Sequence, residues 1–183
     1  MKLSIIILNY NTKDYLKALL DSINSSDALD KQVIIVDNAS TDGSAALIKQ
    51  TFPQFTLIVS PSNLGFSAGN NLGLNYATGE YILFLNSDTQ LYPDTLSTMV
   101  KFMDTHPDVG LSTCRVELAS GQIDPASHRG FPTPWAALTY FIGLEQLFPH
   151  SRLFSQYHQG WQDLSQVHAI DSPAGAFYLT RKV

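Results

Sequence analysis

Three short polar stretches hold the side chains best suited to chemistry, and each follows a continuous apolar run. They are Asn9-Tyr10-Asn11 after residues 3–8, Asp37 after residues 32–36, and Asn86-Ser87-Asp88 after residues 81–85. Continuous apolar runs of this length are typical of strands that are buried on both faces of a parallel sheet. Open α/β sheets bind their ligands at the carboxyl ends of such strands, so we expect a binding site there.

Asp88 is the candidate metal ligand. Mg²⁺ and Mn²⁺ prefer oxygen ligands, and they often take only one or two protein ligands together with the phosphate oxygens of a bound molecule. Asp88 would bind such a cation directly, while Asn86 would bond to a ribose or to a metal-bound water. An isolated Asn-x-Asp is more often a simple turn, so the metal interpretation depends on the motifs around it.

Asp37 opens the stretch Asp-Asn-Ala-Ser-Thr-Asp-Gly. A carboxylate at the end of a buried strand can accept hydrogen bonds from a nucleotide base or ribose. The alternative is a turn residue or a helix cap, for which Asp, Asn, Ser and Thr are the usual residues. Both hold together if Ser40 or Thr41 caps the following helix while Asp37 faces the ligand.

Residues 63–73 combine three glycines with three asparagines. Glycines let backbone N–H groups approach a phosphate closely, and a helix that begins after such a loop adds positive potential. The stretch lacks the Gly-Lys-Ser/Thr ending of a P-loop, and its spacing differs from the dinucleotide fingerprint. We predict a phosphate-binding loop, with a purely structural loop as the alternative.

The spacing of apolar residues predicts the elements that position these motifs. Strands are expected at 3–8, 32–36, 55–59, 81–85 and 109–113, with helices at 14–23, 44–50, before 77 and from Pro93. This alternating order indicates a mostly parallel sheet with right-handed crossovers. After about Arg115 the pattern changes to a small hairpin, a helix at 135–144, a loop at 151–166 and a strand at 177–180. We expect one part over residues 1–115 and a second over 116–183.

Composition narrows the function classes. The 183 residues carry a formal net charge of −5 and no basic run, which argues against nucleic acid as the main partner. The chain has one cysteine, Cys114, so no disulfide can form within it. The apolar residues around Cys114 favour a buried apolar role over a catalytic thiol. The five histidines have no ligand spacing, which argues against a zinc site. No apolar run reaches the length of a membrane span.

The order of the motifs resembles the family 2 nucleotide-sugar glycosyltransferases, which have the GT-A fold, and within them the rhamnosyltransferase-like branch. The motifs are Asn9-Tyr-Asn, Asp37-Asn-Ala-Ser-Thr-Asp-Gly, Asn63-Leu-Gly-Phe-Ser-Ala-Gly-Asn-Asn, Gly79-Glu-Tyr-Ile-Leu-Phe-Leu-Asn-Ser-Asp88 and Ser172-Pro-Ala-Gly-Ala-Phe-Tyr. Each motif is only moderately specific, but five in this order are highly specific. The resemblance implies a Rossmann-like, mostly parallel sheet flanked by helices, with a smaller, partly antiparallel C-terminal part.

The resemblance also implies residue roles. The turn Asn9-Tyr10-Asn11 and Asp37 would contact the base and ribose, and Asp88 would bind the metal on the diphosphate. The residues that would shape the nucleotide-sugar pocket are Asn63, Gly65 and Asn70 or Asn71, while Gly175 and Ala176 match the family's loop at the donor-sugar and acceptor edge. Asn86 stands in place of the first aspartate of the family's Asp-x-Asp signature, a replacement familiar in this branch. The nucleotide-sugar-binding residues implied in this way are Asn9, Tyr10, Asn11, Asp37, Asn63, Gly65, Asn70, Asn71, Asn86, Gly175 and Ala176. Residues 1–115 would form the donor-binding part and residues 116–183 the start of the acceptor side.

The implied reaction is an inverting transfer of a sugar from a nucleotide-diphosphate sugar to a hydroxyl of a glycan or lipid-linked acceptor in cell-surface polysaccharide synthesis. The implied cofactor is a divalent cation, Mn²⁺ or Mg²⁺. dTDP-rhamnose follows from the branch alone, and UDP- and GDP-sugars remain open. The implied location is the cytoplasm or the cytoplasmic face of the membrane, with peripheral membrane association left open.

The catalytic base of the family is an aspartate that follows a Gly-Gly-Phe-Asp-like segment. That segment is expected shortly after residues 177–181, and the chain ends at Val183. We therefore expect the base to lie beyond Val183, and the chain to be the N-terminal part of a longer enzyme that binds donor but catalyses poorly alone. Two other functions are weighed: a non-catalytic nucleotide-sugar-binding module, and a nucleotidyltransferase. The second would carry a glycine-rich basic loop that residues 8–13 lack.

Overall fold

The computed structural model describes residues 1–27, 29–173 and 175–182. The chain divides into two compact units. The first unit comprises Met1–Cys114 and Gly175–Val183, and the second comprises Arg115–Ala174. None of the described helices has the length and apolar character needed to cross a membrane.

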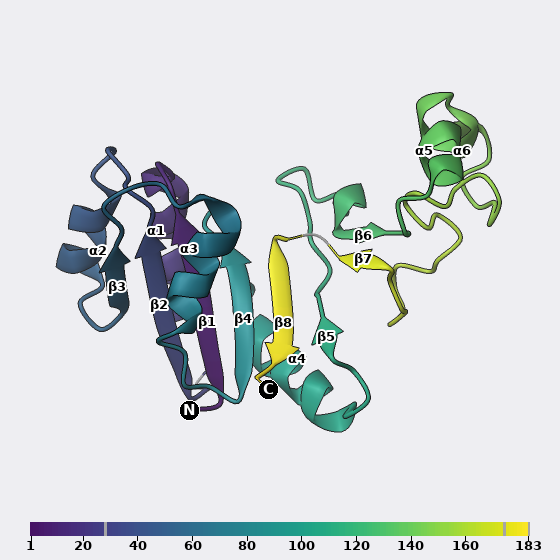
Figure 1. Cartoon of the computed structure of the whole chain (residues 1–183). Coiled ribbons are helices and arrows are strands. Elements are labelled where there is room, and N and C mark those ends of the chain that lie inside the picture. The colour runs from purple at the N-terminus through teal and green to yellow at the C-terminus, as the bar shows by residue number, and fades with distance from the viewer. Residues whose placement is uncertain (28, 174, 183) are drawn as a thin grey trace. The chain divides into compact units, whose positions relative to one another are not determined.

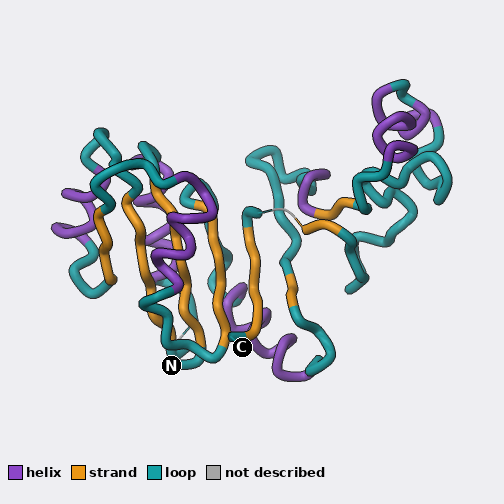
Figure 2. Tube along the Cα trace, in the orientation of Figure 1, coloured by secondary structure: helices purple, strands orange, loops and turns teal. Residues whose placement is uncertain are grey.

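The first unit is built on a six-stranded sheet with strand order β3-β2-β1-β4-β8-β5 (Figures 1 and 2). The strands are β1 (Leu3–Asn9), β2 (Lys31–Asp37), β3 (Thr56–Val59), β4 (Tyr81–Asn86), β5 (Leu111–Ser112) and β8 (Phe177–Arg181). β1 to β4 run parallel, and β8 runs antiparallel to both β4 and β5. The carboxyl ends of β1 to β4 therefore meet at one edge of the sheet, and the start of β8 reaches the same edge.

Helices cover both faces of this sheet because the side chains of its strands alternate between two apolar clusters. α1 (Lys13–Asn24), α2 (Ser44–Thr51) and α4 (Thr95–Thr105) share one cluster with Ile5 and Ile7 of β1. Ile6 belongs to the second cluster, on the face that α3 (Gly65–Leu74) covers (Figure 1). The predicted α/β fold with a mostly parallel, helix-flanked sheet is confirmed.

The stretch predicted as a phosphate-binding loop is mostly helix, because α3 begins at Gly65. Two of its glycines face the strands. A Cβ atom on Gly69 would lie 2.4 Å from Cδ1 of Leu8, and one on Gly73 would lie 2.6 Å from Cγ2 of Ile6. These two glycines therefore let the helix pack closely on the sheet, and the prediction of an open loop was wrong beyond Leu64.

The second unit holds a two-stranded antiparallel sheet and two short helices. Its elements are a 3₁₀ helix at Pro125–Ser127, β6 (His128–Arg129), β7 (Ser172–Pro173), α5 (Pro134–Phe141) and α6 (Leu144–Leu147). The single helix expected at 135–144 is divided, since Gly143 adopts a φ of 78° between α5 and α6. Glu117 pairs with Ile123 in the small hairpin that the sequence predicts. Residues 151–166 contain only turns and bends, in keeping with the predicted loop.

The division of the chain differs from the expected one at its second boundary. The first boundary falls after Cys114, close to the expected residue 115. The chain from Gly175 onward, however, returns to the first unit, because β8 pairs with β4 and β5. The first unit therefore includes the last strand, which a division by sequence order assigns to the second part.

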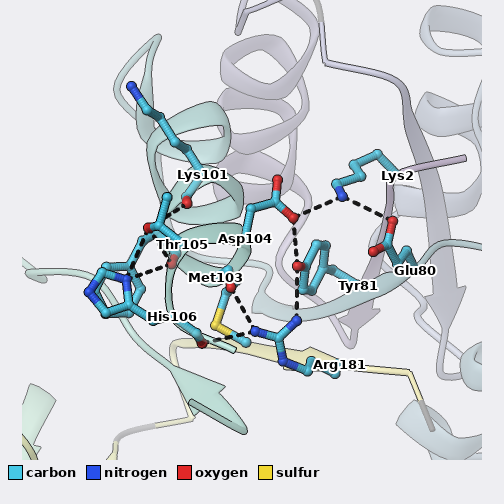
Figure 3. Close-up of polar contacts among 10 residues, drawn as sticks. Lys2, Glu80, Tyr81, Lys101, Met103, Asp104, Thr105, His106 and Arg181 are labelled. Atoms are coloured by element: carbon cyan, nitrogen blue, oxygen red, sulfur yellow. Dashed lines mark hydrogen bonds and ion pairs between the residues drawn. The ribbon is translucent and has the colours of Figure 1, made fainter. Parts of the chain in front are cut away.

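β8 is fastened at the amino edge of the sheet by Arg181, as Figure 3 shows. Its guanidinium donates to the hydroxyl of Tyr81 at 3.0 Å, and that hydroxyl donates to Asp104 of α4 at 2.7 Å. The same guanidinium donates to three main-chain carbonyls at and beyond the end of α4, those of Met103, His106 and Val109. Lys2 bridges Asp104 and Glu80 with two ion pairs of 2.9 Å each. This cluster lies at the edge opposite to the candidate site and holds β8 in place between β4 and β5.

Candidate functional site

Asn9 and Asp37 form the centre of a buried network where β1 and β2 end. Asn9 Nδ2 donates to Asp37 Oδ1 at 2.8 Å and to Ser40 Oγ at 3.0 Å. The other carboxylate oxygen of Asp37 accepts from the backbone N–H of Ser40 at 3.1 Å. Asp37 is 1% exposed and Asn9 is fully buried, so neither side chain is open to solvent in this structure. The pair instead shapes the loops that reach the surface.

Thr12 joins this network to the turn after β4. Its Oγ1 donates to Asn9 Oδ1 at 2.6 Å and lies 2.8 Å from Ser87 Oγ. Thr12 is the residue before α1, but its side chain makes no capping bond to that helix. Asp42 supplies that bond from the next loop, since its Oδ2 accepts from the backbone N–H of Lys13 at 2.8 Å. The ends of three strands are thus held together by small polar side chains.

The same Asp42 also binds the first residue of α2, where the sequence indicated Ser40 or Thr41 as the cap. Asp42 Oδ1 accepts from both the hydroxyl and the backbone N–H of Ser44, the first residue of that helix. Partial desolvation raises the pKa of Asp42, but the hydrogen bonds from Ser44 and Lys13 outweigh it and lower the pKa below its ordinary value. The carboxylate of Asp42 therefore stabilises the first turns of both α1 and α2.

Tyr10 and Asn11 form the accessible part of the first loop. The Tyr10 side chain is half-exposed, and an exposed aromatic ring offers a face on which a base can stack. Asn11 has a φ of 55°, which few residues other than glycine adopt readily, and its Oδ1 accepts from the backbone N–H of Thr41 at 2.8 Å. Its own N–H donates to Ser40 Oγ at 3.1 Å. These bonds hold the loop beneath Tyr10 in one shape.

Asn63 holds the start of α3 against the end of β2. Its Oδ1 accepts from Asn38 Nδ2 and from the backbone N–H of Gly65, both at 2.8 Å. Asn38 Oδ1 in turn accepts from the N–H of Leu64 at 2.8 Å. Gly65 has a φ of 76°, a conformation that a glycine adopts at no cost. Asn63 and Gly65 therefore shape the loop from within.

Three hydrogen bonds hold the Asn86-Ser87-Asp88 turn, and the carboxylate of Asp88 is exposed. The N–H of Asn86 donates to the carbonyl of Ala176 at 3.1 Å, and the carbonyl of Asn86 accepts from Thr89 Oγ1 at 2.9 Å. The buried Ser87 is held by Thr12. Asp88 is exposed, and its carboxylate makes no hydrogen bond or ion pair to another described residue. The turn thus presents Asp88 on a fixed support.

Three further predicted residues meet in one cavity of about 390 Å³ beside α3. Its lining consists of Phe66, Ser67, Asn70, Asn71, Phe84, Gly175 and Tyr178. Asn70 and Asn71 come from α3, Phe84 from β4 and Tyr178 from β8, the last two being direct partners across the sheet. Aromatic rings with amide and hydroxyl groups between them are the usual lining of a site for a small polar ligand.

The structure therefore gathers the predicted residues into two neighbouring groups. Asn9, Asn11 and Asp37 belong to the network that Thr12 links to the Asp88 turn, while Asn70, Asn71 and Gly175 line the cavity. Ala176 joins the groups through its bond to Asn86. Sequence reasoning missed Thr12, Asn38 and Ser87, because small polar residues at strand ends read as caps and turns. Their position directly beside predicted site residues was the available signal.

Comparison of the sequence with known protein families identifies the family of this chain. The sequence model of Glycosyl transferase family 2 matches residues 4–169. The chain belongs to glycosyl transferase family 2. A glycosyltransferase of Nostoc sp. is 34% identical over 136 residues, which make up 71% of this chain and 42% of that protein. The chain thus spans well under two thirds of the length of this relative.

Solved structures of the same kind share the fold. TarS of S. aureus (residues 1–349, in complex with UDP) superposes with a TM-score of 0.59 at 28% identity, covering 74% of this chain and 39% of that one. TarS is a poly(ribitol-phosphate) beta-N-acetylglucosaminyltransferase. The mannosyltransferase of Pyrobaculum calidifontis, in complex with GDP-Man and Mn²⁺, superposes with a TM-score of 0.57 at 29% identity, covering 64% of this chain and 36% of that one. The GT-A fold is thereby shown for this glycosyl transferase family 2 chain.

Proposed function

We propose that this family 2 chain binds a nucleotide-diphosphate sugar at the carboxyl edge of its sheet, as the donor-binding part of an inverting glycosyltransferase. The observation that carries the proposal is the fixed, outward carboxylate of Asp88 beside the network of Asn9, Asn11 and Asp37. That arrangement provides a place for a diphosphate next to a place for a nucleoside. The UDP and GDP-Man complexes of the structural relatives support the same ligand class.

The roles within the donor site follow from exposure. Tyr10 and Asn11 are accessible and would contact the base and ribose, whereas the buried Asn9 and Asp37 would position them. Asn63 and Gly65 would fix the loop that borders the nucleotide. In the cavity beside α3, Asn70 and Asn71 would bond to sugar hydroxyls. Gly175 and Ala176 would form the edge shared with the acceptor.

A divalent cation, Mn²⁺ or Mg²⁺, fits the chemistry of the turn. Among the described residues, no three His, Cys, Asp or Glu side chains gather into a metal site of their own. One exposed carboxylate, supplemented by diphosphate oxygens, is a common arrangement for Mg²⁺-type cations, so Asp88 would hold the cation and Asn86 would stand beside it. Such a cation supplies charge that stabilises a departing diphosphate. Asp88 contributes by keeping that charge at a fixed position.

The acceptor would be a hydroxyl of a glycan or lipid-linked molecule in cell-surface polysaccharide synthesis, at or near the cytoplasmic face of the membrane. TarS is a poly(ribitol-phosphate) beta-N-acetylglucosaminyltransferase, which supports a polymeric acceptor. The residue that deprotonates the acceptor hydroxyl stays unassigned. dTDP-rhamnose remains one candidate donor beside UDP- and GDP-sugars.

A thermal-shift panel of nucleoside diphosphates and nucleotide sugars, each with and without Mn²⁺, tests this function. We expect one nucleotide class to raise the melting temperature, and the rise to require Mn²⁺, because ligand that binds only the folded state stabilises it. Asp108→Asn, which removes another exposed carboxylate of the same unit, is the matched control for Asp88→Asn. No shift with any nucleotide at millimolar concentration would contradict the proposal.

A further inference from the structure

Arg129 of the second unit is a half-buried cation without a counterion. Its Nε is buried without a hydrogen-bond partner, and its guanidinium makes no hydrogen bond or ion pair to another described residue. The other two arginines of this unit are satisfied, since Arg115 pairs with Glu117 at 2.9 Å and Arg152 is exposed to water. A guanidinium cannot lose its proton in a protein, and a charge that is removed from water without a partner is costly. An anion bound at Arg129 would offset that cost.

The carboxylates of the second unit do not supply this anion, because each of them is bonded elsewhere. Asp171 is the nearest in the strand register, since it precedes Ser172, which pairs with Arg129. Its Oδ2 accepts instead from the backbone N–H of Phe131 and from Gln159 Nε2, both at 3.1 Å. The other four carboxylates of the unit also bond to residues other than Arg129; they are Glu117, Asp124, Glu145 and Asp163. With no described carboxylate in ion-pair contact with Arg129, a bound molecule is left to supply the negative charge.

Ser172 adds a second free donor directly opposite Arg129 in the sheet of β6 and β7. Paired residues of an antiparallel sheet project from the same face, with their Cβ atoms about 4.5–5.5 Å apart. The hydroxyl of Ser172 makes no hydrogen bond to another described residue, so it can donate to a ligand. The terminal nitrogens of the guanidinium, which also make no hydrogen bond, are not buried, so a ligand can reach them from solvent. A charged fork beside a free hydroxyl is a donor set that suits the oxygens of a phosphate group.

The chain on either side of this pair is held in place before any ligand binds. The N–H of Gly130, the residue after Arg129, donates to the carbonyl of Tyr157 at 3.0 Å. A Cβ atom on Gly130 would lie 2.0 Å from the carbonyl oxygen of Gln156, so the two segments are in close contact. The two bonds of Asp171 hold the start of β7 against the same region. The donors therefore keep their spacing, which lowers the entropy that a ligand must remove on binding.

The charge at this face is a single one, because the neighbouring histidine does not add to it. His128 precedes Arg129 in β6, and successive residues of a strand point to opposite faces. The ring of His128 lies 6.4 Å from that of His168. Desolvation, together with His168 and His158, lowers the pKa of His128, so this ring is neutral at pH 7. One positive charge matches the single negative charge of a phosphodiester better than the charge of about −1.5 to −2 on a phosphomonoester.

We propose that Arg129 and Ser172 form a binding site for a phosphodiester group of the acceptor. The free phosphate oxygens accept from the guanidinium of Arg129 and from the hydroxyl of Ser172. Gly175, which lines the cavity beside α3, follows Ser172 by three positions in the sequence, so the site lies on the chain segment that leads into that cavity. The assignment to the acceptor rests on the proposed function. The binding of a phosphodiester does not, since it needs neither nucleotide nor Mn²⁺.

A titration of the 183-residue chain with diglycerol phosphate, a diester, tests the proposal. It is followed by the nuclear magnetic resonance signals of the arginine Nε–H groups, without Mn²⁺ and at constant ionic strength. We expect the signal of Arg129, identified by its loss in Arg129→Met, to move and to saturate at millimolar concentration. Glycerol phosphate, the monoester, should bind more weakly. Tighter binding of the monoester would overturn the assignment to a diester.

Matched variants locate the binding. Followed by the backbone N–H signals of β6 and β7, the affinity for the diester should fall at least about tenfold in Arg129→Met and about threefold in Ser172→Ala. Arg152→Met makes the same change at an exposed arginine of the same unit and should bind as the wild type does. Asp88→Asn should also bind as the wild type does, because the donor site takes no part.

The melting temperature without ligand separates a binding role of Arg129 from a structural one. Arg129→Met removes a half-buried charge that has no partner, so the melting temperature should stay the same or rise. The proposal is overturned if that variant melts lower than the wild type, if the Arg129 signal does not respond to the diester, or if Arg152→Met weakens binding equally. Diester binding in a chain that no nucleotide stabilises would keep this site and reject the proposed donor site. The reverse result would reject this site alone.

Discussion

The side-chain amide of Asn9 donates a 2.8 Å hydrogen bond to the carboxylate of Asp37, where β1 and β2 end side by side. Both side chains are buried. The register of the two strands pairs these residues directly, so a single bond fixes two loops at once. A site built in this way separates the residues that shape it from the residues that touch the ligand.

Asn9→Ala tests the shaping role. The change leaves Asp37 Oδ1 without its Asn9 donor, and an unsatisfied buried polar group costs about 1–3 kcal/mol. We expect the free energy of unfolding, measured in urea, to fall by about 2–3 kcal/mol. Asn75→Ala, which removes an exposed amide at the end of α3, should change it by less than about 0.5 kcal/mol. Equal effects of the two variants would contradict the assigned role.

Gly73→Ala tests the close approach of α3 to the sheet. The new methyl group would lie 2.6 Å from Cγ2 of Ile6 and 3.1 Å from Cγ2 of Val36, both on buried β-branched side chains. Overpacking of this kind costs about 1–3 kcal/mol, and the better helix propensity of alanine returns at most about 1 kcal/mol. We expect a net loss of stability in thermal unfolding. Gly110→Ala, where no atom lies within 4 Å, is the control and should be near neutral.

Arg181→Met tests the anchor of β8. The variant removes the donors to the hydroxyl of Tyr81 and to the carbonyls at the end of α4. Hydrogen bonds from a charged donor contribute about 1.5–3 kcal/mol when buried and less when partly exposed, so we expect a loss of about 1–2 kcal/mol. Lys101→Met, which removes an exposed cation of α4, should leave stability unchanged within about 0.5 kcal/mol. An equal loss of stability in both variants would contradict the assigned role, because it would show that the loss of a positive charge, rather than of the hydrogen bonds of Arg181, lowers the stability.

Cys114 should behave as an inert thiol. Desolvation raises its pKa to about 11, so the thiolate that reacts with disulfide reagents is scarce at neutral pH. We expect modification by 5,5′-dithiobis(2-nitrobenzoate) at pH 8 to be slow in the folded protein and fast in urea. Rapid labelling of folded protein at that pH would contradict the raised pKa of this half-buried thiol.

The raised pKa of Cys114 also makes the stability of the fold depend on pH. The unfolded thiol loses its proton near its ordinary pKa of about 8.5, whereas the folded thiol keeps it until about pH 11. The folded state therefore binds more protons in that window, and its stability should decrease as the pH rises through it. Cys114→Ala should lack this part of the decrease, and a slope that is the same in both proteins would contradict the assignment.

Helix α1 follows from apolar spacing alone, since Leu16, Leu19, Leu20 and Ile23 all face the core as their period predicts. Burial of Asn9 and Asp37 could not be predicted, because it depends on the register of strands that lie 28 residues apart. Glycine content could not distinguish a phosphate loop from the packed helix α3, since both require the absence of a Cβ atom.

Two features depend on tertiary context. β8 joins the sheet as an antiparallel strand beside β4, across a chain separation that no local pattern reports. α5 exposes Phe141 and buries Thr139, the reverse of what hydrophobic periodicity indicates for a surface helix. Both features depend on contacts between segments that are distant in sequence, which local patterns do not determine.

The role of Asp88 is tested most directly by calorimetric titration of the Mn²⁺ complex of the nucleoside diphosphate selected in the thermal-shift panel. The titration compares the wild type with Asp88→Asn and with the control Asp108→Asn. We predict that Asp88→Asn weakens binding at least about tenfold and removes its dependence on Mn²⁺, since the cation loses its protein ligand. The control variant should bind as the wild type does. Unchanged, Mn²⁺-dependent affinity in Asp88→Asn would contradict the account.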